Sequence, residues 1–182
     1  MKYDFDYIST YILEYDAGVP KNVIFYGCAV VGGMIILISL ISTNGIKFIK
    51  NASWCLLLGY VFFVLSATIL FRQEGEKMQY VLRPLWSYGV LYSKLLAQNL
   101  LNILMFIPIG FLSGVAMRNV KALKIVGMGC VLSVLIEVIQ LLFRRGVCNI
   151  DDVIHNTLGC AVGILCYLFC YKMVRTTLHL SE

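Results

Sequence analysis

Five long apolar runs, separated by short polar segments, dominate the pattern of hydrophobic and polar positions along the chain. Each run is close to the roughly 20 residues that an α-helix needs to cross a hydrocarbon layer about 30 Å thick. Backbone groups in lipid must be bonded within their own segment, which favours helices for all five runs. The pattern predicts an all-α, polytopic membrane bundle with spans at 23–43, 54–71, 95–117, 125–143 and 151–173.

The composition agrees with a membrane protein. Of the 182 residues, 60% are hydrophobic, whereas soluble domains are about 45–50% apolar. All cysteines except Cys148 lie inside the apolar runs, where a free cysteine behaves as a small hydrophobic residue. The net charge of +5 is explained by positive loops against anionic lipid. The sequence shows no basic patch of the kind that binds nucleic acid, so we expect no nucleic-acid partner.

The polar segments predict the topology. Residues 1–21 are acidic and are expected to form an extracytoplasmic tail or interfacial helix, followed by a transmembrane domain at 22–175 and a short cytoplasmic tail at 176–182. The loops at 44–53 and 118–124 contain basic residues and no acid. Because cytoplasmic loops carry an excess of Lys and Arg, we expect the N-terminus outside and the C-terminus in the cytoplasm.

Polar residues inside the fourth run form a single stripe. Ser133, Glu137, Gln140 and Arg144 follow one another at intervals of four, three and four residues, which places them on one helical face. Glu137 then lies about 10 Å below the end marked by Arg144. An ionisable group at that depth is costly and usually faces a bundle interior or a water-filled cavity.

The fifth run repeats this arrangement. Asp152, Asn156, Gly159 and Gly163 share a face, with the polar pair near the start and the glycines below it. The spacing of the glycines is the GxxxG pattern that lets a neighbouring helix approach closely. The stripe is therefore expected to face the interior of the bundle.

Together these positions predict a polar cavity that opens to the outer face of the membrane. An alternative is that the same groups only cap and pair with one another to fix the register of the helices, although buried ion pairs stabilise poorly. The expected ligand-binding residues are Arg72, Asn99, Asn102, Glu137, Gln140, Arg144, Arg145, Asp151, Asp152 and Asn156.

The two adjacent acids are expected to differ in role. We expect Arg145 or Arg72 to bond the carboxylate of Asp151 or Asp152, because neighbouring acids at a membrane interface repel each other. Asp152 is expected to begin the fifth helix, where the exposed N–H groups favour a carboxylate. Asp151 would then be the freer carboxylate, available to a ligand or a metal ion.

The motifs in the second half of the chain resemble the VanZ-like family of small bacterial membrane proteins. The resemblance rests on "NILMFIPIGF" (102–111), on "SVLIEVIQLLFRRGVCNIDDVIHNTLG" (133–159), and on the Pro-aromatic segment "RPLWSY" (83–88). Two positions depart from the family pattern: Asn149 stands where an additional Asp is frequent, and His155 stands where an aliphatic residue is usual. The residues that match the pattern are Asn102, Phe106, Pro108, Gly110, Ser133, Glu137, Gln140, Arg145, Asp151, Asp152, Asn156 and Gly159.

The resemblance implies a protein of the Gram-positive cell envelope. The family's namesake confers low-level resistance to teicoplanin, a lipoglycopeptide that acts outside the membrane. An outward-facing cavity agrees with that location, but the resemblance supplies no biochemical mechanism and no cofactor.

Three classes of function remain open at the level of sequence. The chain could bind an amphiphile, such as a lipoglycopeptide, a lipid-linked envelope precursor or a membrane lipid, with its arginines meeting phosphate or carboxylate. It could be an intramembrane hydrolase or transferase with Glu137 or Asp151 as a catalytic group and with Asp151, Asp152 and His155 as candidate metal ligands. No recognised catalytic motif supports that class. It could also be a structural or regulatory membrane partner without a small ligand.

Overall fold

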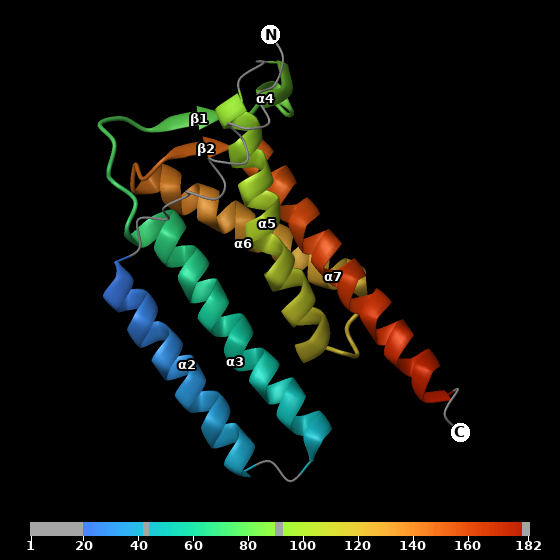
Figure 1. Ribbon diagram of the computed structural model, residues 1–182. Helices are drawn as coiled ribbons and strands as arrows, with labels where there is room; N and C mark the ends of the chain where they lie inside the picture. Colours follow the sequence, from blue (N-terminus) through green and yellow to red (C-terminus); the bar gives the residue numbers. More distant parts are fainter. Residues whose placement is uncertain (1–19, 42–43, 90–92, 180–182) are drawn as a thin grey trace.

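Five long helices make up most of the part of the chain that the computed structural model describes, residues 20–41, 44–89 and 93–179 (Figure 1). The long helices are α2 (Lys21–Ile41), α3 (Gly45–Leu65), α5 (Ser93–Ala116), α6 (Ala122–Leu142) and α7 (Ile150–His179). The shorter elements are a π-helical turn η1 (Ser66–Leu70), the strand β1 (Gln79–Val81), the single-turn helix α4 (Trp86–Gly89) and the strand β2 (Val147–Asn149).

The predicted all-α fold is confirmed, and each of the five long helices is long and apolar enough to cross a membrane, as expected. The second helix begins earlier than expected, because the Asn44 side chain caps it by accepting hydrogen bonds from the backbone N–H groups of Ile46 and Lys47. The last helix continues to His179, into the segment that was expected to be a tail. The tail or interfacial helix expected at the N-terminus falls on residues 1–19, outside the described residues.

The helices α5 and α7 form the centre of the bundle and approach each other closely. A Cβ atom added at Gly159 or Gly163 would overlap the backbone carbonyls of Ile103 and Ile107 on α5. The expected role of the GxxxG pattern is therefore confirmed, and its partner is α5. The buried core around this crossing includes Phe106 and residues of α3, α6 and α7.

The helix α2 lies at the edge of the bundle, beside α3 (Figure 1). Its hydrophobic window contains no buried position, so most of its apolar surface faces outward. Contact with α3 includes Val31, whose side chain lies against Gly59. The site described below therefore depends on α3, α5, α6 and α7 rather than on α2.

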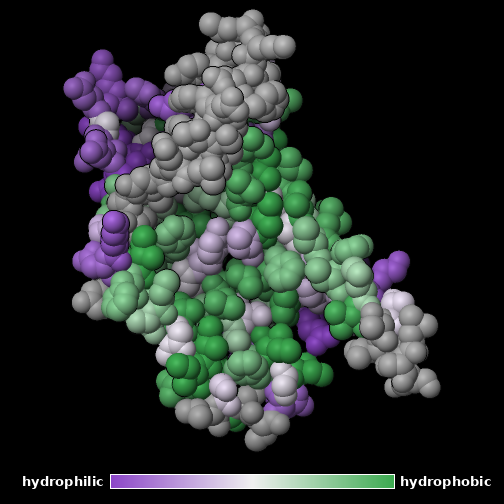
Figure 2. Space-filling model, in the orientation of Figure 1, coloured by the Kyte–Doolittle hydropathy of each residue, from purple (hydrophilic) through white to green (hydrophobic). Residues whose placement is uncertain are grey.

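The two ends of the bundle differ in structure. At one end β1 and β2 pair in parallel, with Gln79 opposite Val147 and Val81 opposite Asn149, and α4 lies close by (Figure 1). The C-terminal ends of α2, α5 and α7 lie at the other end (Figure 1). Figure 2 shows hydrophobic residues over the helices and a concentration of hydrophilic residues at the end where Figure 1 places β1 and the segment before it.

Candidate functional site

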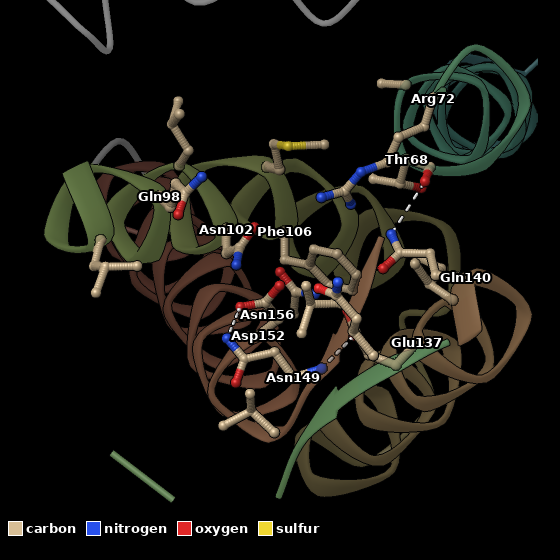
Figure 3. Close-up of a pocket in the computed structure, with 18 of the residues that line it drawn as sticks. Thr68, Arg72, Gln98, Asn102, Phe106, Glu137, Gln140, Asn149, Asp152 and Asn156 are labelled. Carbon is tan, nitrogen blue, oxygen red and sulfur yellow. Dashed lines mark hydrogen bonds between the residues drawn. The ribbon is translucent and has the colours of Figure 1, made fainter. Parts of the chain in front are cut away.

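A cleft of about 640 Å³ opens at the end of the bundle that holds the two strands. Its walls come from η1, α5, α6, β1, β2 and the start of α7 (Figure 3). The polar side chains that line it are Thr68, Arg72, Gln79, Gln98, Asn102, Glu137, Gln140, Asn149, Asp152 and Asn156. Apolar residues, among them Phe106 and Ile136, form the remainder of the lining.

The strand pair forms one wall of this cleft. Gln79 and Val81 on β1, and Val147 and Asn149 on β2, line it. Side chains two positions apart on a strand point to the same side, so one face of the small sheet is turned to the cleft. These strands were not predicted from the sequence, because three-residue strands within polar connections carry no periodic signal.

Asn149 organises the acidic part of the cleft. Its backbone N–H donates to Glu137 Oε2 at 2.8 Å, and its side-chain Nδ2 donates to Asp152 Oδ1 at 2.9 Å (Figure 3). Its Oδ1 accepts from the backbone N–H of Asp151 and from Trp86 Nε1, both at 3.1 Å. A carboxylate at this position could not donate to Asp152, so the amide that departs from the family pattern suits the contacts of this chain.

Asn149 is also the residue that caps α7. The helix begins at Ile150, and Asn149 Oδ1 accepts from the N–H two positions on, as an N-cap side chain does. The expectation that Asp152 begins the helix is therefore wrong. Asp151 and Asp152 lie in its first turn, where the positive end of the helix dipole favours both charges.

Arg72 supplies the positive charge of the cleft. Its guanidinium group projects into the space between α5 and Gln140 (Figure 3), and its charge interacts favourably with the carboxylates of Glu137 and Asp152. Gly146 leaves room for it: an added Cβ would come within 2.8 Å of the Arg72 Cζ. Gly146 also has a φ of +147°, which favours glycine.

Gln140, near the end of α6, and Arg145, just after it, donate hydrogen bonds to the π-helical turn η1. Gln140 Nε2 donates to Thr68 O at 3.1 Å, and Arg145 Nη1 donates to Ile69 O at 2.8 Å and to Leu70 O at 2.5 Å. The guanidinium of Arg145 is thus used by backbone carbonyls at the end of a helix, which need partners there. Of the two arginines expected to bond Asp151 or Asp152, Arg145 does not do so, whereas the charge of Arg72 interacts favourably with Asp152.

The side-chain oxygen of Gln140, a residue of the cleft lining, has no hydrogen-bond partner in the described structure. The Gln140 side chain is 2% exposed, and this oxygen, Oε1, is buried. A buried acceptor without a partner is unfavourable. A ligand group that donates a hydrogen bond to Oε1 would remove this cost.

Arg144 has a backbone role at the end of α6. Its φ of +54° is left-handed, its N–H donates to Leu141 O, and the N–H of Arg145 donates to Gln140 O. These two bonds form a Schellman motif, in which the left-handed position is usually glycine. The Arg144 side chain is exposed and does not line the cleft.

Asp151 is held by Leu85, just before α4, and by Ser87 within α4, and it does not line the cleft. Its side chain is fully buried, and its Oδ1 accepts from the backbone N–H of Leu85. Its Oδ2 accepts from the N–H of Ser87 at 3.2 Å and from the Ser87 hydroxyl at 2.6 Å. The expectation that Asp151 is the freer carboxylate is therefore wrong. Asp152 is partly exposed and faces the cleft.

His155 extends the structural contacts of Asp151. Its Nδ1 lies 2.5 Å from Asp151 O and its Nε2 lies 2.7 Å from the Tyr88 hydroxyl. Because a carbonyl only accepts, Nδ1 donates to Asp151 O, and Nε2 is paired with the Tyr88 hydroxyl. Among the described residues no group of three His, Cys, Asp or Glu side chains is arranged to hold a metal ion, so Asp151, Asp152 and His155 do not form the metal site considered above.

Two of the expected asparagines, Asn102 and Asn156, line the cleft, whereas Asn99 does not. Asn102 on α5 interacts with the Asp152 carboxylate, and Asn156 Nδ2 donates to Ser133 Oγ at 2.8 Å. Asn99 is buried on α5 and donates to Ser87 Oγ at 2.9 Å, away from the cleft lining.

The structure thus separates the predicted ligand-binding residues into two groups. Those that line the cleft are Arg72, Asn102, Glu137, Gln140, Asp152 and Asn156. Those that do not are Asn99, Arg144, Arg145 and Asp151. Sequence reasoning missed the contributions of Thr68, Leu85, Ser87, Tyr88, Gly146 and Asn149. The "RPLWSY" segment carried a signal, since it contains three of these residues, Leu85, Ser87 and Tyr88.

Cys148 on β2 lies beside the acidic groups. Burial raises the pKa of its thiol above the ordinary value, and the charges of Glu137 and Asp152 raise it further. A thiol with a raised pKa is a poor nucleophile near neutral pH. The pKa of the Cys148 thiol therefore depends on the charges of Glu137 and Asp152, and the thiol is not expected to act as a nucleophile near neutral pH.

Comparisons with known proteins agree with this architecture. A family model described as VanZ/LLP1 matches residues 24–171, a range that includes every residue of the cleft. Protein VanZ of Enterococcus faecium is 38% identical over 66 residues, which make up 36% of this chain and 41% of that protein. The match therefore spans about two fifths of that relative's length. No solved structure matches the chain. Since the family model covers most of the sequence, the chain belongs to the VanZ/LLP1 family of multi-pass membrane proteins.

Proposed function

We propose that this protein binds the polar head of an amphiphilic ligand in the cleft, at the outer face of the cell membrane. The ligand would be a lipoglycopeptide or a lipid-linked precursor of the envelope. Membership of the VanZ/LLP1 family supports a connection with low-level teicoplanin resistance. The binding residues we propose are Arg72, Asn102, Glu137, Gln140, Asp152 and Asn156.

The observation that carries this proposal is the unpaired Gln140 Oε1 in a cleft that also presents Arg72. A guanidinium group suits a phosphate or carboxylate, because its planar N–H groups match two oxygens at once. The free Oε1 and the carboxylates of Glu137 and Asp152 suit hydroxyl or amine donors. The cleft therefore favours a ligand that combines an anionic group with several donors, as a phosphosugar or a glycopeptide does.

The size of the cleft limits how much of the ligand it can hold. Its volume of about 640 Å³ lies within the range of about 300–1,000 Å³ that is typical of ligand pockets. This is room for a head group and not for a whole lipoglycopeptide. The acyl chain would remain in the bilayer against the apolar surfaces of the helices.

Binding can be tested with purified protein and two matched probes, teicoplanin and the same glycopeptide without its acyl chain. Arg72→Gln removes the positive charge of the cleft lining, whereas the control Arg83→Gln removes the positive charge of an exposed residue outside the lining. We expect native mass spectrometry to show binding of the acylated probe that is weakened about tenfold by Arg72→Gln, the effect of about 1.4 kcal/mol. Equal affinity of both variants for the probe would contradict the proposal.

Glu137→Gln separates the binding function from the enzymatic alternative. Glu137 is 4% exposed and already accepts one backbone hydrogen bond, so the isosteric amide should keep the fold. For a binding protein the substitution changes affinity for the probe. For a hydrolase or transferase it would instead abolish conversion of a lipid-linked substrate while the substrate still binds.

The proposed orientation places the cleft outside and the turn after α5 in the cytoplasm. A single cysteine introduced at Glu76, which is exposed at the cleft end, should react with a membrane-impermeant maleimide in intact cells. A cysteine at Asn119, exposed at the other end, should react only after the cells are opened. The native cysteines would first be replaced in both variants. The reverse pattern would place the cleft in the cytoplasm and exclude direct contact with an external drug.

A further inference from the structure

A second cavity, of about 610 Å³, lies at the end of the bundle opposite the cleft. Residues of α3, of the turn after α5 and of α7 line it, among them Lys50, Trp54, Met117, Arg118, Tyr167 and Tyr171. We infer that this cavity binds the head group of an anionic phospholipid, whose phosphate lies between Lys50 and Arg118. The inference does not depend on the function proposed for the cleft.

Charge at this end of the bundle is of one sign among the described residues. Lys50 and Arg118 line the cavity, and other basic side chains follow nearby at Lys47, Lys121 and Lys124. The acids of the described chain all belong to the cleft end; they are Glu74, Glu76, Glu137, Asp151 and Asp152. An anion in the cavity therefore meets two cations and no described carboxylate on its lining.

Arg118 is held in place by aromatic rings. Its Cζ lies 5.5 Å from the centre of the Tyr171 ring, and Tyr171 stacks on Tyr167 with 6.0 Å between ring centres. Gly114 makes room for this arrangement, since a Cβ added there would come within 2.5 Å of the Tyr167 ring. A cation–π contact leaves N–H groups of the guanidinium available for phosphate oxygens. The rings thus restrain the Arg118 side chain beside the cavity.

The position and lining of the cavity favour a lipid over a free phosphate. The cavity lies where spanning helices end, which is the level of lipid head groups. Trp54 lies one helical turn beyond Lys50 on the same face of α3, and Met117 and Leu168 add apolar surface. Tryptophan and tyrosine prefer this interface, and basic pockets between spanning helices hold anionic head groups. A free phosphate ion has no apolar part that could contact the apolar lining.

Fluorescence of Trp54 gives a direct measure of binding. The sequence contains two tryptophans, so Trp86→Phe leaves Trp54 as the single reporter. The protein would be titrated in an uncharged detergent with phosphatidylglycerol, with phosphatidylcholine of the same chains, and with inorganic phosphate. At about 0.3 M salt, diffuse attraction between distant charges is largely screened. We expect saturable binding of phosphatidylglycerol, at least about tenfold weaker binding of phosphatidylcholine, and no competition from phosphate.

Two double variants with the same net charge separate a built site from general attraction. Lys50→Gln with Arg118→Gln removes the cations of the cavity, whereas Lys47→Gln with Lys124→Gln removes exposed cations outside it. All four side chains are exposed, so the variants should keep the fold, which gel filtration and circular dichroism check.

We expect the first double variant to lose phosphatidylglycerol affinity about tenfold, and the second to change it about twofold or less. Lys50→Arg, which keeps the charge, should bind as the unmodified protein does. Equal losses in both double variants would overturn the inference, because they would mean that the basic surface attracts lipid without a site. Competition by phosphate, or equal binding of phosphatidylcholine, would overturn the assignment to an anionic lipid.

Discussion

Replacing each of the two adjacent acids by asparagine tests the assignment of their roles. The Asp151 carboxylate is fully buried, with Leu85 N–H on one oxygen and Ser87 N–H and Oγ on the other. In Asp151→Asn an NH2 group replaces one oxygen, so in either orientation a donor faces a backbone donor. Asp152 is partly exposed, and its partners Asn149 and Asn102 are side-chain amides rather than backbone groups. In Asp152→Asn the remaining oxygen can still accept from Asn149, and the Asn102 amide can turn to accept from the new NH2 group.

The expected loss of stability follows from the bonds that are broken. A hydrogen bond to a charged group contributes about 1.5–3 kcal/mol, and a buried donor without a partner costs about 1–3 kcal/mol. Asp151→Asn should therefore destabilise the protein by about 2–4 kcal/mol, and Asp152→Asn by less than about 1 kcal/mol. For a chain of this length, 1 kcal/mol corresponds to about 2–4 °C in the melting temperature, so the Asp151 variant should melt about 5–15 °C lower.

Thermal unfolding in detergent measures both variants, and binding of teicoplanin by the folded protein gives the second readout. Ser87→Ala serves as a partner for a double-mutant cycle, since it removes one donor to Asp151. Coupling between Asp151→Asn and Ser87→Ala should be about 0.5–3 kcal/mol, as for residues in one hydrogen-bond network. If Asp151→Asn melted like the unmodified protein while Asp152→Asn melted far lower, the assignment of Asp151 to structure and Asp152 to the cleft would be refuted.

Three further predictions follow from the backbone and the helix contacts. Arg144→Gly should raise the free energy of unfolding by about 1 kcal/mol, because glycine suits the left-handed position. It should leave binding of teicoplanin unchanged, because the side chain lies outside the cleft, and weaker binding would mean that Arg144 contacts the ligand. Gly163→Ala should lower the melting temperature because its Cβ would overlap Ile107 O, whereas the control Gly127→Ala, with open space around its Cβ, should leave it unchanged or raise it by the effect of about 0.5–1 kcal/mol. Alkylation of Cys148 should have a midpoint above the ordinary thiol pKa, and Glu137→Gln should lower that midpoint and speed the reaction, because it removes a charge that disfavours the thiolate; an unchanged pH–rate profile would contradict the placement of Glu137.

The spans and the position of the cleft were accessible from sequence because both depend on short-range periodicity. An apolar run of about 20 residues fixes a span whatever its neighbours are. Glu137 and Gln140, three residues apart, must share a face of their helix, as must Asp152 and Asn156, four apart. Since both pairs lie near the connection between α6 and α7, they converge at one end, as Figure 3 shows.

The roles of individual polar residues were not accessible, because their partners are distant in sequence. Asp151 and Asp152 are adjacent, and the structure distinguishes them through Leu85 and Ser87, more than 60 residues away. Arg145 likewise bonds carbonyls of η1, at the end of α3, more than 70 residues away. No local pattern predicts which of two neighbouring acids such a segment will meet.

The features around the cleft argue against a role limited to fixing helix register. Groups that only cap and pair should satisfy one another, and those of Asp151, Ser87, Asn99 and His155 do so. The polar groups of the cleft lining do not all satisfy one another, because Gln140 Oε1 is buried without a hydrogen-bond partner in the described structure. Gly146, which has a φ of +147° that favours glycine, lies beside the same lining, and its missing Cβ leaves room for the Arg72 guanidinium. The buried acceptor that lacks a partner in the described structure thus lies in the cleft lining, and on the function proposed above a hydrogen-bond donor of the ligand would pair with it.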